Sequence, residues 1–300
     1  MRIVFSTAAR SLGVVLLVSA ALPGCAETGA AGSNESDGSL EIRTAFYPLQ
    51  FVTERVAGPA ADVRNLTKAG AEPHDLELGP REVADLGSAD LVVYLSGFQP
   101  AVDTAVAQEA AASAYDVADA ARLDLGSDPH FWLDPTRLAD VADAVAGRLG
   151  EVDPGRAGEF RRNAEGLRRD LLGLDRDLSE GLGDCESRDL VTSHTAFGYL
   201  AQRYRLDQHG ITGISPDSEP TSGDLAEVAD FVRTHAVRTI YHEPLVSSDV
   251  AATVAKETGA RMASLDPVEG LDDSSAGGDY IEVMRANLAT LREGQPCRTR

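Results

Sequence analysis

The chain has 300 residues, enough for two domains that each bury their own core. Its hydrophobic (43%) and charged (25%) fractions are those of a folded globular protein. The formal net charge is −21, from 27 Lys+Arg against 48 Asp+Glu. This charge excludes a nucleic-acid-binding protein, because a phosphate backbone requires a basic surface, and it is compatible with a cation as ligand.

Residues 1–24 are typical of an export signal. Arg2 and Arg10 precede an apolar run, SLGVVLLVSAALPG, that is too short to span a bilayer. The run ends in LPGC, which is similar to the lipobox of bacterial lipoproteins, where the cysteine becomes the acylated first residue. We therefore predict a signal peptide over 1–24, a lipid on Cys25, and an extracytoplasmic protein anchored to the cell membrane. The alternative is an ordinary signal peptide with an incidental cysteine.

Residues 25–39 contain no large apolar side chain, so this segment cannot build a core. We expect it to be a flexible tether between the membrane and the folded body. Export also places Cys185 and Cys297 in an oxidising compartment, where an even pair favours a disulfide. The alternative is two free buried thiols.

From residue 40 onward, short apolar runs alternate with longer amphipathic ones, which predicts parallel α/β layers. The expected strands cover 40–45, 62–66, 91–95 and 115–117, then 189–192, 206–211, 238–241 and 261–264. The expected helices cover 49–58, 79–86 and 101–111, then 196–203, 222–235, 248–258 and 278–292. Two similar sets of four strands predict two α/β lobes, over 40–152 and 184–300, each with a small, mostly parallel sheet and flanking helices.

A long helix is expected between the two lobes, over 153–183. Asp153 and Pro154 are suited to its N-cap and first position. An apolar stripe at spacings of three and four then follows, made of Phe160, Ala164, Leu167, Leu171, Leu174, Leu178 and Leu182. Such a helix would join the lobes rigidly. The alternative is that Gly166, Gly173 and Gly181 break it into pieces, at about 1 kcal/mol per glycine.

Three of the six histidines follow predicted strands, at the sheet edge where α/β proteins bind ligands. His74 lies in GAEPHDL, His130 in DPHFWLDP and His194 in VTSHTAF. Asp266, in SLDP, occupies the equivalent place after the last strand. Three imidazoles and one carboxylate suit a tetrahedral Zn²⁺, so we predict these four residues as metal ligands from both lobes. An isolated histidine is more often packed or exposed than a ligand, and His209, His235 and His242 are expected to be ordinary residues.

Four further carboxylates lie near these positions. Asp75 and Asp134 are candidates to orient imidazoles, although either could instead cap the helix that follows. Glu72 could replace Asp266 as the oxygen ligand. Glu243 could hydrogen-bond a ligand or gate the site, or cap the helix that begins near Ser248.

Several of these motifs, in this order and spacing, resemble the metal-binding components of bacterial ABC importers for zinc and manganese. They are AGAEPHDLELGPREVADLGSADLVVYLSGF, DPHFWLDP, VTSHTAFGYLAQRYRL, ISPDSEPTSGDLAEV, HEPLVS and LDPVEGL. The resemblance covers about residues 42–297. It implies two α/β lobes bridged by one long helix, and a divalent metal bound in the cleft between them. It also implies that the metal is handed to a membrane permease with its ATPase.

The resemblance further implies that His74, His130 and His194 are ligands and that Asp266 is the fourth. The chain lacks the histidine-rich loop that zinc-specific members often carry before the second ligand, since residues 123–128 read LDLGSD. The third ligand is histidine, where manganese members tend to have glutamate. A nitrogen-rich site favours zinc over manganese.

The predicted function is thus a non-catalytic, monomeric zinc receptor. A manganese- or iron-binding receptor of the same family is the first alternative. A surface adhesin of the same fold is not separable from the zinc receptor by sequence. The second is an exported zinc hydrolase with Glu243 as base, because three histidines plus an open position compose a catalytic zinc site. A receptor closes the fourth position with a carboxylate, whereas an enzyme leaves water there.

Overall fold

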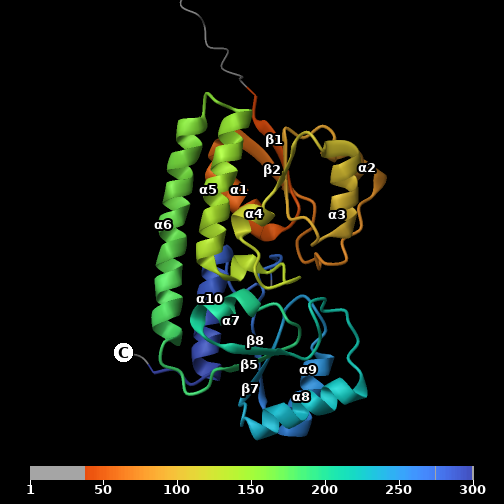
Figure 1. Ribbon diagram of the computed structural model, residues 1–300, viewed down its shortest axis with the longest axis vertical. Helices are drawn as coiled ribbons and strands as arrows, with labels where there is room; N and C mark the ends of the chain where they lie inside the picture. Colours follow the sequence, from red (N-terminus) through yellow and green to blue (C-terminus); the bar gives the residue numbers. More distant parts are fainter. Residues whose placement is uncertain (1–37, 274, 299–300) are drawn as a thin grey trace, which may run out of the picture. The chain divides into compact units, whose positions relative to one another are not determined.

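The computed structural model describes residues 38–273 and 275–298, so the predicted signal peptide, Cys25 and nearly all of the predicted tether lie outside the described residues. Two four-stranded parallel sheets form its framework (Figure 1). The first has the order β2-β1-β3-β4 and the second β6-β5-β7-β8. Their strands are β1 (Leu40–Thr44), β2 (Ala61–Asn65), β3 (Leu91–Tyr94), β4 (Ala114–Asp116), β5 (Asp189–Thr192), β6 (Asp207–Gly210), β7 (Thr239–His242) and β8 (Arg261–Ser264). The predicted fold of two parallel α/β lobes is confirmed.

Helices flank both sheets, as the amphipathic segments predict. Those of the first lobe are α1 (Tyr47–Ala57), α2 (Pro80–Leu86), α3 (Pro100–Ala105) and α4 (Ala118–Ala121). Those of the second are α7 (Gly198–Tyr204), α8 (Ser222–Thr234), α9 (Asp249–Thr258) and α10 (Tyr280–Gly294). Short turns of other helix types cover Gly58–Ala60, Val106–Ala110 and Phe131–Leu133. No helix within the described ranges is both long and apolar enough to cross a membrane.

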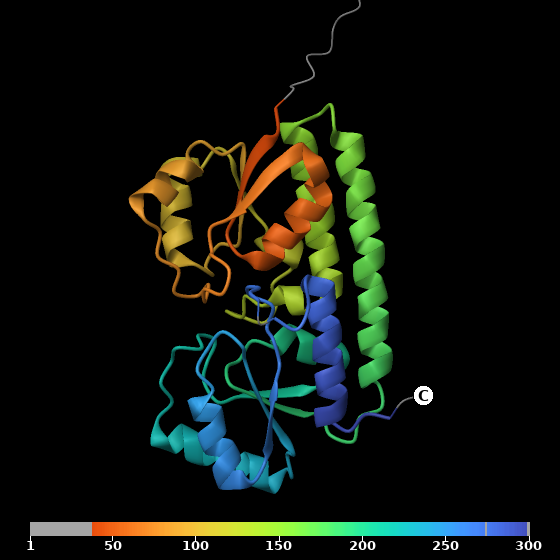
Figure 2. The ribbon, with the colours of Figure 1, turned by 180° about the vertical axis from the view of Figure 1, so that it is seen from behind.

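One long helix joins the two lobes, as predicted, and it packs against the helix that precedes it in the chain. α5 (Pro135–Val152) and α6 (Ala157–Leu182) pack along each other, and α6 also contacts α1 and α10 (Figures 1 and 2). With 26 residues, α6 is about 39 Å long at 1.5 Å per residue. It therefore runs beside helices of both lobes.

The stripe of seven apolar residues predicted for this helix is buried throughout. The helix begins later than expected, however. Asp153 ends α5, with its N–H bonded to the carbonyl of Leu149, so Asp153 and Pro154 form the turn before α6. The three glycines do not break the helix. At Gly181 a Cβ would lie 2.8 Å from Leu288 of α10, so glycine permits close packing there.

One large apolar cluster joins the first sheet, α5, α6, α7 and α10, while a smaller one lies between the second sheet and α8 and α9. Two helices of the second lobe thus share a core with the first lobe. The predicted disulfide is present: Cys185 is bonded to Cys297 and joins the chain after α6 to the chain after α10. The disulfide therefore holds the segment that leads into β5 against the segment after α10.

Candidate metal centre

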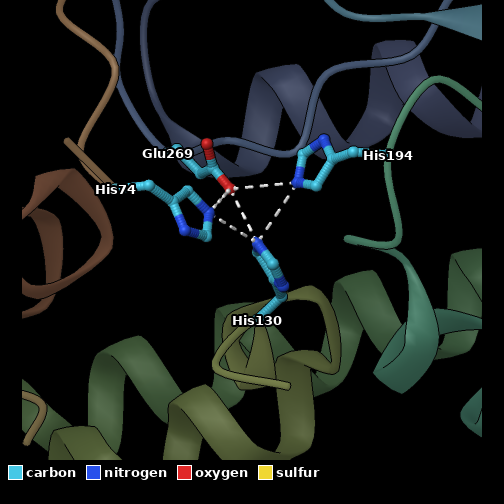
Figure 3. Close-up of side chains that lie close together, drawn as sticks. All are labelled: His74, His130, His194 and Glu269. Carbon is cyan, nitrogen blue, oxygen red and sulfur yellow. Dashed lines mark hydrogen bonds and ion pairs between the residues drawn. The ribbon is translucent and has the colours of Figure 1, made fainter. Parts of the chain in front are cut away.

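The side chains of His74, His130, His194 and Glu269 converge (Figure 3). Nε2 of His130 lies 3.3 Å from Nε2 of His74 and 3.4 Å from Nε2 of His194. Oε1 of Glu269 lies 2.8, 3.5 and 3.8 Å from Nε2 of His130, His74 and His194, respectively. Four potential ligand atoms therefore face one point.

Loops that follow parallel strands carry His74, His194 and Glu269, while His130 lies in the loop after α4. His74 lies in the loop between β2 and α2, His130 just before the helical turn Phe131–Leu133, and His194 just after β5. Glu269 follows β8. His74 and His130 belong to one lobe, and His194 and Glu269 belong to the other. Parallel strands direct all their carboxyl ends to the same sheet edge, so the loops of each lobe lie together at that edge.

The spacing of the nitrogen atoms fits a small tetrahedral metal. Metal–nitrogen bonds of 2.0–2.1 Å in a tetrahedron place the ligand atoms about 3.3 Å apart. The two measured separations between imidazole nitrogens are 3.3 and 3.4 Å. In addition, Oε1 of Glu269 is buried and accepts no well-directed hydrogen bond from the described part of the chain, although it lies among three imidazoles. The donor set thus fits a metal ion at its centre.

Burial keeps water away from this group. His130 and His194 are fully buried, Glu269 is 3% exposed and the His74 side chain is 8% exposed. The ring of Phe98 packs edge-on against His74 at 4.8 Å, measured between ring centroids. An ion bound here would be held by protein atoms.

Two carboxylates contact the Nδ1 atoms of His130 and His194, on the ring side opposite the converging Nε2 atoms. Oδ1 of Asp128 accepts hydrogen bonds from the backbone N–H of His130 at 2.9 Å and from its Nδ1 at 2.7 Å. Oε2 of Glu243 lies 2.6 Å from Nδ1 of His194 as an ion-pair contact, and its Oε1 accepts a 2.6 Å hydrogen bond from Ser193 Oγ. Contacts at Nδ1 leave Nε2 of each ring free to bind a metal.

The electrostatics favour a cation. Burial alone would lower the pKa of His130, but the contacts with Asp128 and Glu269 raise it to about 9. Burial raises the pKa of Glu269, whereas the neighbouring His130 and His74 lower it more strongly, to well below its usual range. Glu269 is therefore an anion, and positive charge is stabilised in front of it.

Asp266, the predicted fourth ligand, is outside the converging group. Its Oδ1 accepts a 2.7 Å hydrogen bond from the N–H of Val268, so its carboxylate is turned back onto its own loop. Its backbone is paired with the side-chain amide of Asn287 through two hydrogen bonds. Val268 has a φ of +57°, an uncommon conformation for a β-branched residue. Asp266 thus stabilises the turn that carries Glu269. Glu269 itself was not predicted, although it belongs to the motif LDPVEGL.

The other predicted carboxylates have different places. Asp134 caps α5 by accepting from the N–H and Oγ1 of Thr136, so the capping alternative is the observed one. Oε2 of Glu72 accepts from the N–H of His74 at 2.9 Å and so supports its loop. Its carboxylate belongs to a separate group with Asp75 and Asp217. Asp128, two residues before His130 in DPHFWLDP, was not predicted.

The remaining histidines lie elsewhere. His209, on β6, packs against Phe231, which in turn stacks on the exposed ring of His235. His242 is half-buried at the end of β7 and is outside the converging group. None of the three belongs to the converging group, and His209 lies instead in a separate group with Asp189 and Asp207.

Comparisons with known proteins find zinc-binding and zinc-uptake proteins. Residues 42–294 match the model of the family described as "Zinc-uptake complex component A periplasmic" (ZnuA). The zinc-binding protein AdcA of Streptococcus pyogenes serotype M6 is 33% identical over 289 residues, which cover 86% of this chain and 56% of AdcA. The chain thus spans just over half the length of AdcA. The high-affinity zinc uptake system protein ZnuA of Bacillus subtilis is 32% identical over 296 residues, covering 90% of this chain and 92% of that protein.

Solved structures are similar as well. The laminin-binding protein Lmb of Streptococcus agalactiae, described as an adhesin with metal-transporting activity, superimposes with a TM-score of 0.80 at 33% identity. That match covers 86% of this chain and all of Lmb. The Zn(II)-bound ZnuA-like domain of Streptococcus pneumoniae AdcA gives a TM-score of 0.75 at 34% identity, over 86% of this chain and 99% of that one. This chain therefore belongs to the family described as zinc-uptake complex component A, periplasmic (ZnuA).

Proposed function

We propose that this protein is an extracytoplasmic receptor that captures Zn²⁺ and delivers it to an ABC permease driven by its ATPase. The observation that carries the proposal is the convergence of three Nε2 atoms and one carboxylate oxygen, in which two of the separations between nitrogen atoms fit tetrahedral coordination. Relatives named as zinc-binding and zinc uptake proteins support the choice of cargo. The proposed ligands are His74, His130, His194 and Glu269.

Zinc is favoured over manganese or iron by the donor atoms. Three imidazole nitrogens and one oxygen are a preferred set for Zn²⁺, whereas Mn²⁺ prefers a larger number of oxygen ligands. A bound zinc would have its charge reduced to +1 by Glu269, and the carboxylates of Asp128 and Glu243 lie behind two of the imidazoles. The site therefore suits a doubly charged ion.

A zinc hydrolase is disfavoured by the same geometry. A catalytic site keeps one open position for water, but Oε1 of Glu269 occupies the direction of a fourth ligand. Glu243, the base of that alternative, is engaged with Ser193 and His194 behind the imidazole. Neither group is placed for activating water.

We further propose that residues 1–24 are removed and that a lipid on Cys25 anchors the protein to the membrane. Residues 25–39 are proposed to be the tether of a folded body with two lobes, 40–152 and 184–300, which are connected by residues 153–183. Support comes from the apolar run and LPGC in the sequence and from a relative in Streptococcus pneumoniae named a zinc-binding lipoprotein. The receptor is proposed to act as a monomer. Labelling of growing cells with a fatty-acid analogue should mark the wild type and not Cys25→Ser, and labelling of both would contradict the anchor.

Zinc uptake tests the function itself. Cells lacking the gene should accumulate less zinc at limiting supply, and the wild-type gene should restore uptake. The His194→Ala gene should not restore it, whereas His235→Ala, which changes an exposed histidine of the same lobe outside the site, should. Equal uptake with and without the gene would contradict the proposal.

A further inference from the structure

The segment that ends at His130 is in close contact with the first residues of α7, which belong to the other lobe. Tyr199 Oη accepts hydrogen bonds from the backbone N–H groups of Asp124 and Leu125, at 3.1 and 3.4 Å. Tyr199 is fully buried, and the Arg137 guanidinium lies 4.6 Å from its ring centroid. One lobe therefore supports the chain leading to a ligand of the other.

Gly198, the residue before Tyr199, lies close to the same segment. A Cβ on Gly198 would lie 2.4 Å from Oδ2 of Asp128 and 3.3 Å from Cδ1 of Leu125. The φ of Gly198 is not in the left-handed region, so the backbone conformation itself would accept alanine. What excludes a side chain at this position is the space taken by the Asp128 carboxylate.

The Asp128 carboxylate is not free to move aside. It is buried, and its Oδ1 holds both the backbone N–H and Nδ1 of His130. The backbone N–H of Asp128 is also bonded to the carbonyl of Leu125. A rotation that relieved a contact with residue 198 would therefore break the hydrogen bonds that orient the imidazole.

We propose that Asp128 is the residue that positions His130 for the metal, and that Gly198 is required on the opposite lobe because it leaves room for the Asp128 carboxylate. The inference rests on the proposed zinc function and adds two residues that bind no metal themselves. Carboxylates that orient a metal-bound histidine commonly contribute 10- to 100-fold to metal affinity. The affinity of the site thus depends on the fit of α7 against residues 124–128.

A double-mutant cycle on the purified protein tests this relation. Zinc affinity is measured by competition with a chelating indicator for wild type, Asp128→Ala, Gly198→Ala and the double variant. We expect each single change to weaken zinc binding about 10- to 100-fold. We expect the double variant to bind like Asp128→Ala, within about twofold, because the new methyl group then has no carboxylate to displace.

A matched control is Gly147→Ala in α5, where a Cβ would have no atom within 4 Å, and its zinc affinity should be unchanged. The visible absorption of bound Co²⁺ provides a second readout, since it reports ligand geometry rather than stability. It should change in both single variants and not in the control. If Gly198→Ala alone does not fold, the double variant should still fold and bind like Asp128→Ala.

Several outcomes would overturn the proposal. One is that the two single losses multiply in the double variant, since the two residues would then act independently. Others are an unchanged affinity in Asp128→Ala, an unchanged Co²⁺ spectrum in the single variants, or a double variant that does not fold. If wild type bound no zinc at all, the proposed function would fail as well, so the two failures are distinguishable.

Discussion

Oε1 of Glu269 lies 2.8 Å from Nε2 of His130, although the two residues come from different lobes. This contact brings together the loop after β8 and the segment before the Phe131–Leu133 turn. Both side chains are buried. The pKa of His130 is raised, which favours its cationic form, and the pKa of Glu269 is lowered, which favours its anionic form. The pair therefore links the two halves of the site.

The first prediction separates Glu269 from Asp266. Glu269→Gln should weaken zinc binding by more than the 10- to 100-fold typical of residues behind the ligands, because it removes the anionic ligand. Asp266→Asn should bind zinc nearly as wild type does, since its oxygen can still accept from Val268. Competition with a chelating zinc indicator measures both. If Asp266→Asn weakened zinc binding more than Glu269→Gln did, Asp266 would be the ligand instead.

The second prediction concerns stability and pH. Burial raises the pKa of Asp266 from 3.8 to about 6. Between these values the unfolded chain has lost its proton and the native protein retains it, so native stability falls as pH rises through this window. From about pH 4 to pH 7 the free energy of unfolding of wild type, relative to Asp266→Asn, should fall by roughly 2 kcal/mol. Denaturant unfolding of the metal-free proteins at both pH values checks this, and a constant difference would contradict it.

The third prediction uses the single tryptophan. The ring centroids of Trp132 and His130 are 5.2 Å apart, and Trp132 Nε1 donates to the carbonyl of Pro267 in the loop that carries Glu269. Zinc binding changes the charge on His130, so tryptophan emission should change and saturate at one equivalent of zinc. His130→Ala should show no such change. A continued change beyond one equivalent in wild type would point to binding elsewhere.

The fourth prediction concerns the disulfide. Cys185 and Cys297 close a loop with a sequence separation of 112. Such a crosslink typically stabilises the native state by roughly 2–5 kcal/mol, because it restricts the unfolded chain. A reductant should therefore lower the melting temperature of wild type. The Cys185→Ala/Cys297→Ala variant serves as control, because its melting temperature should be the same with and without reductant. Two reactive thiols at these positions in the unreduced, denatured protein would refute the bond.

The fold was predictable because its signals are local and repeated. Alternating apolar runs mark the strands, and a stripe ending at Leu182 marks α6. The start of α6 was not predictable from its caps, since Asp153 and Pro154 suit a helix start but serve the turn after α5. Whether a potential capping residue ends one helix or begins the next depends on how the two helices pack.

The three histidines were predictable from their position after strands, because parallel topology sets where strand ends meet. The carboxylate was not. Asp266 and Glu269 lie in one loop, and the direction of each side chain depends on a turn with Val268 at positive φ. Asp128 was missed for a related reason: its role depends on Gly198, which only the tertiary fold places beside it.

The most direct measurement of the central claim is a competitive titration of the purified protein with Zn²⁺ and Mn²⁺. We expect wild type to bind one Zn²⁺ tightly and to retain it in the presence of excess Mn²⁺, because three imidazoles and one carboxylate favour zinc. His130→Ala should lose this binding and His235→Ala should keep it. Equal or tighter binding of Mn²⁺, or unchanged zinc binding by His130→Ala, would contradict the account.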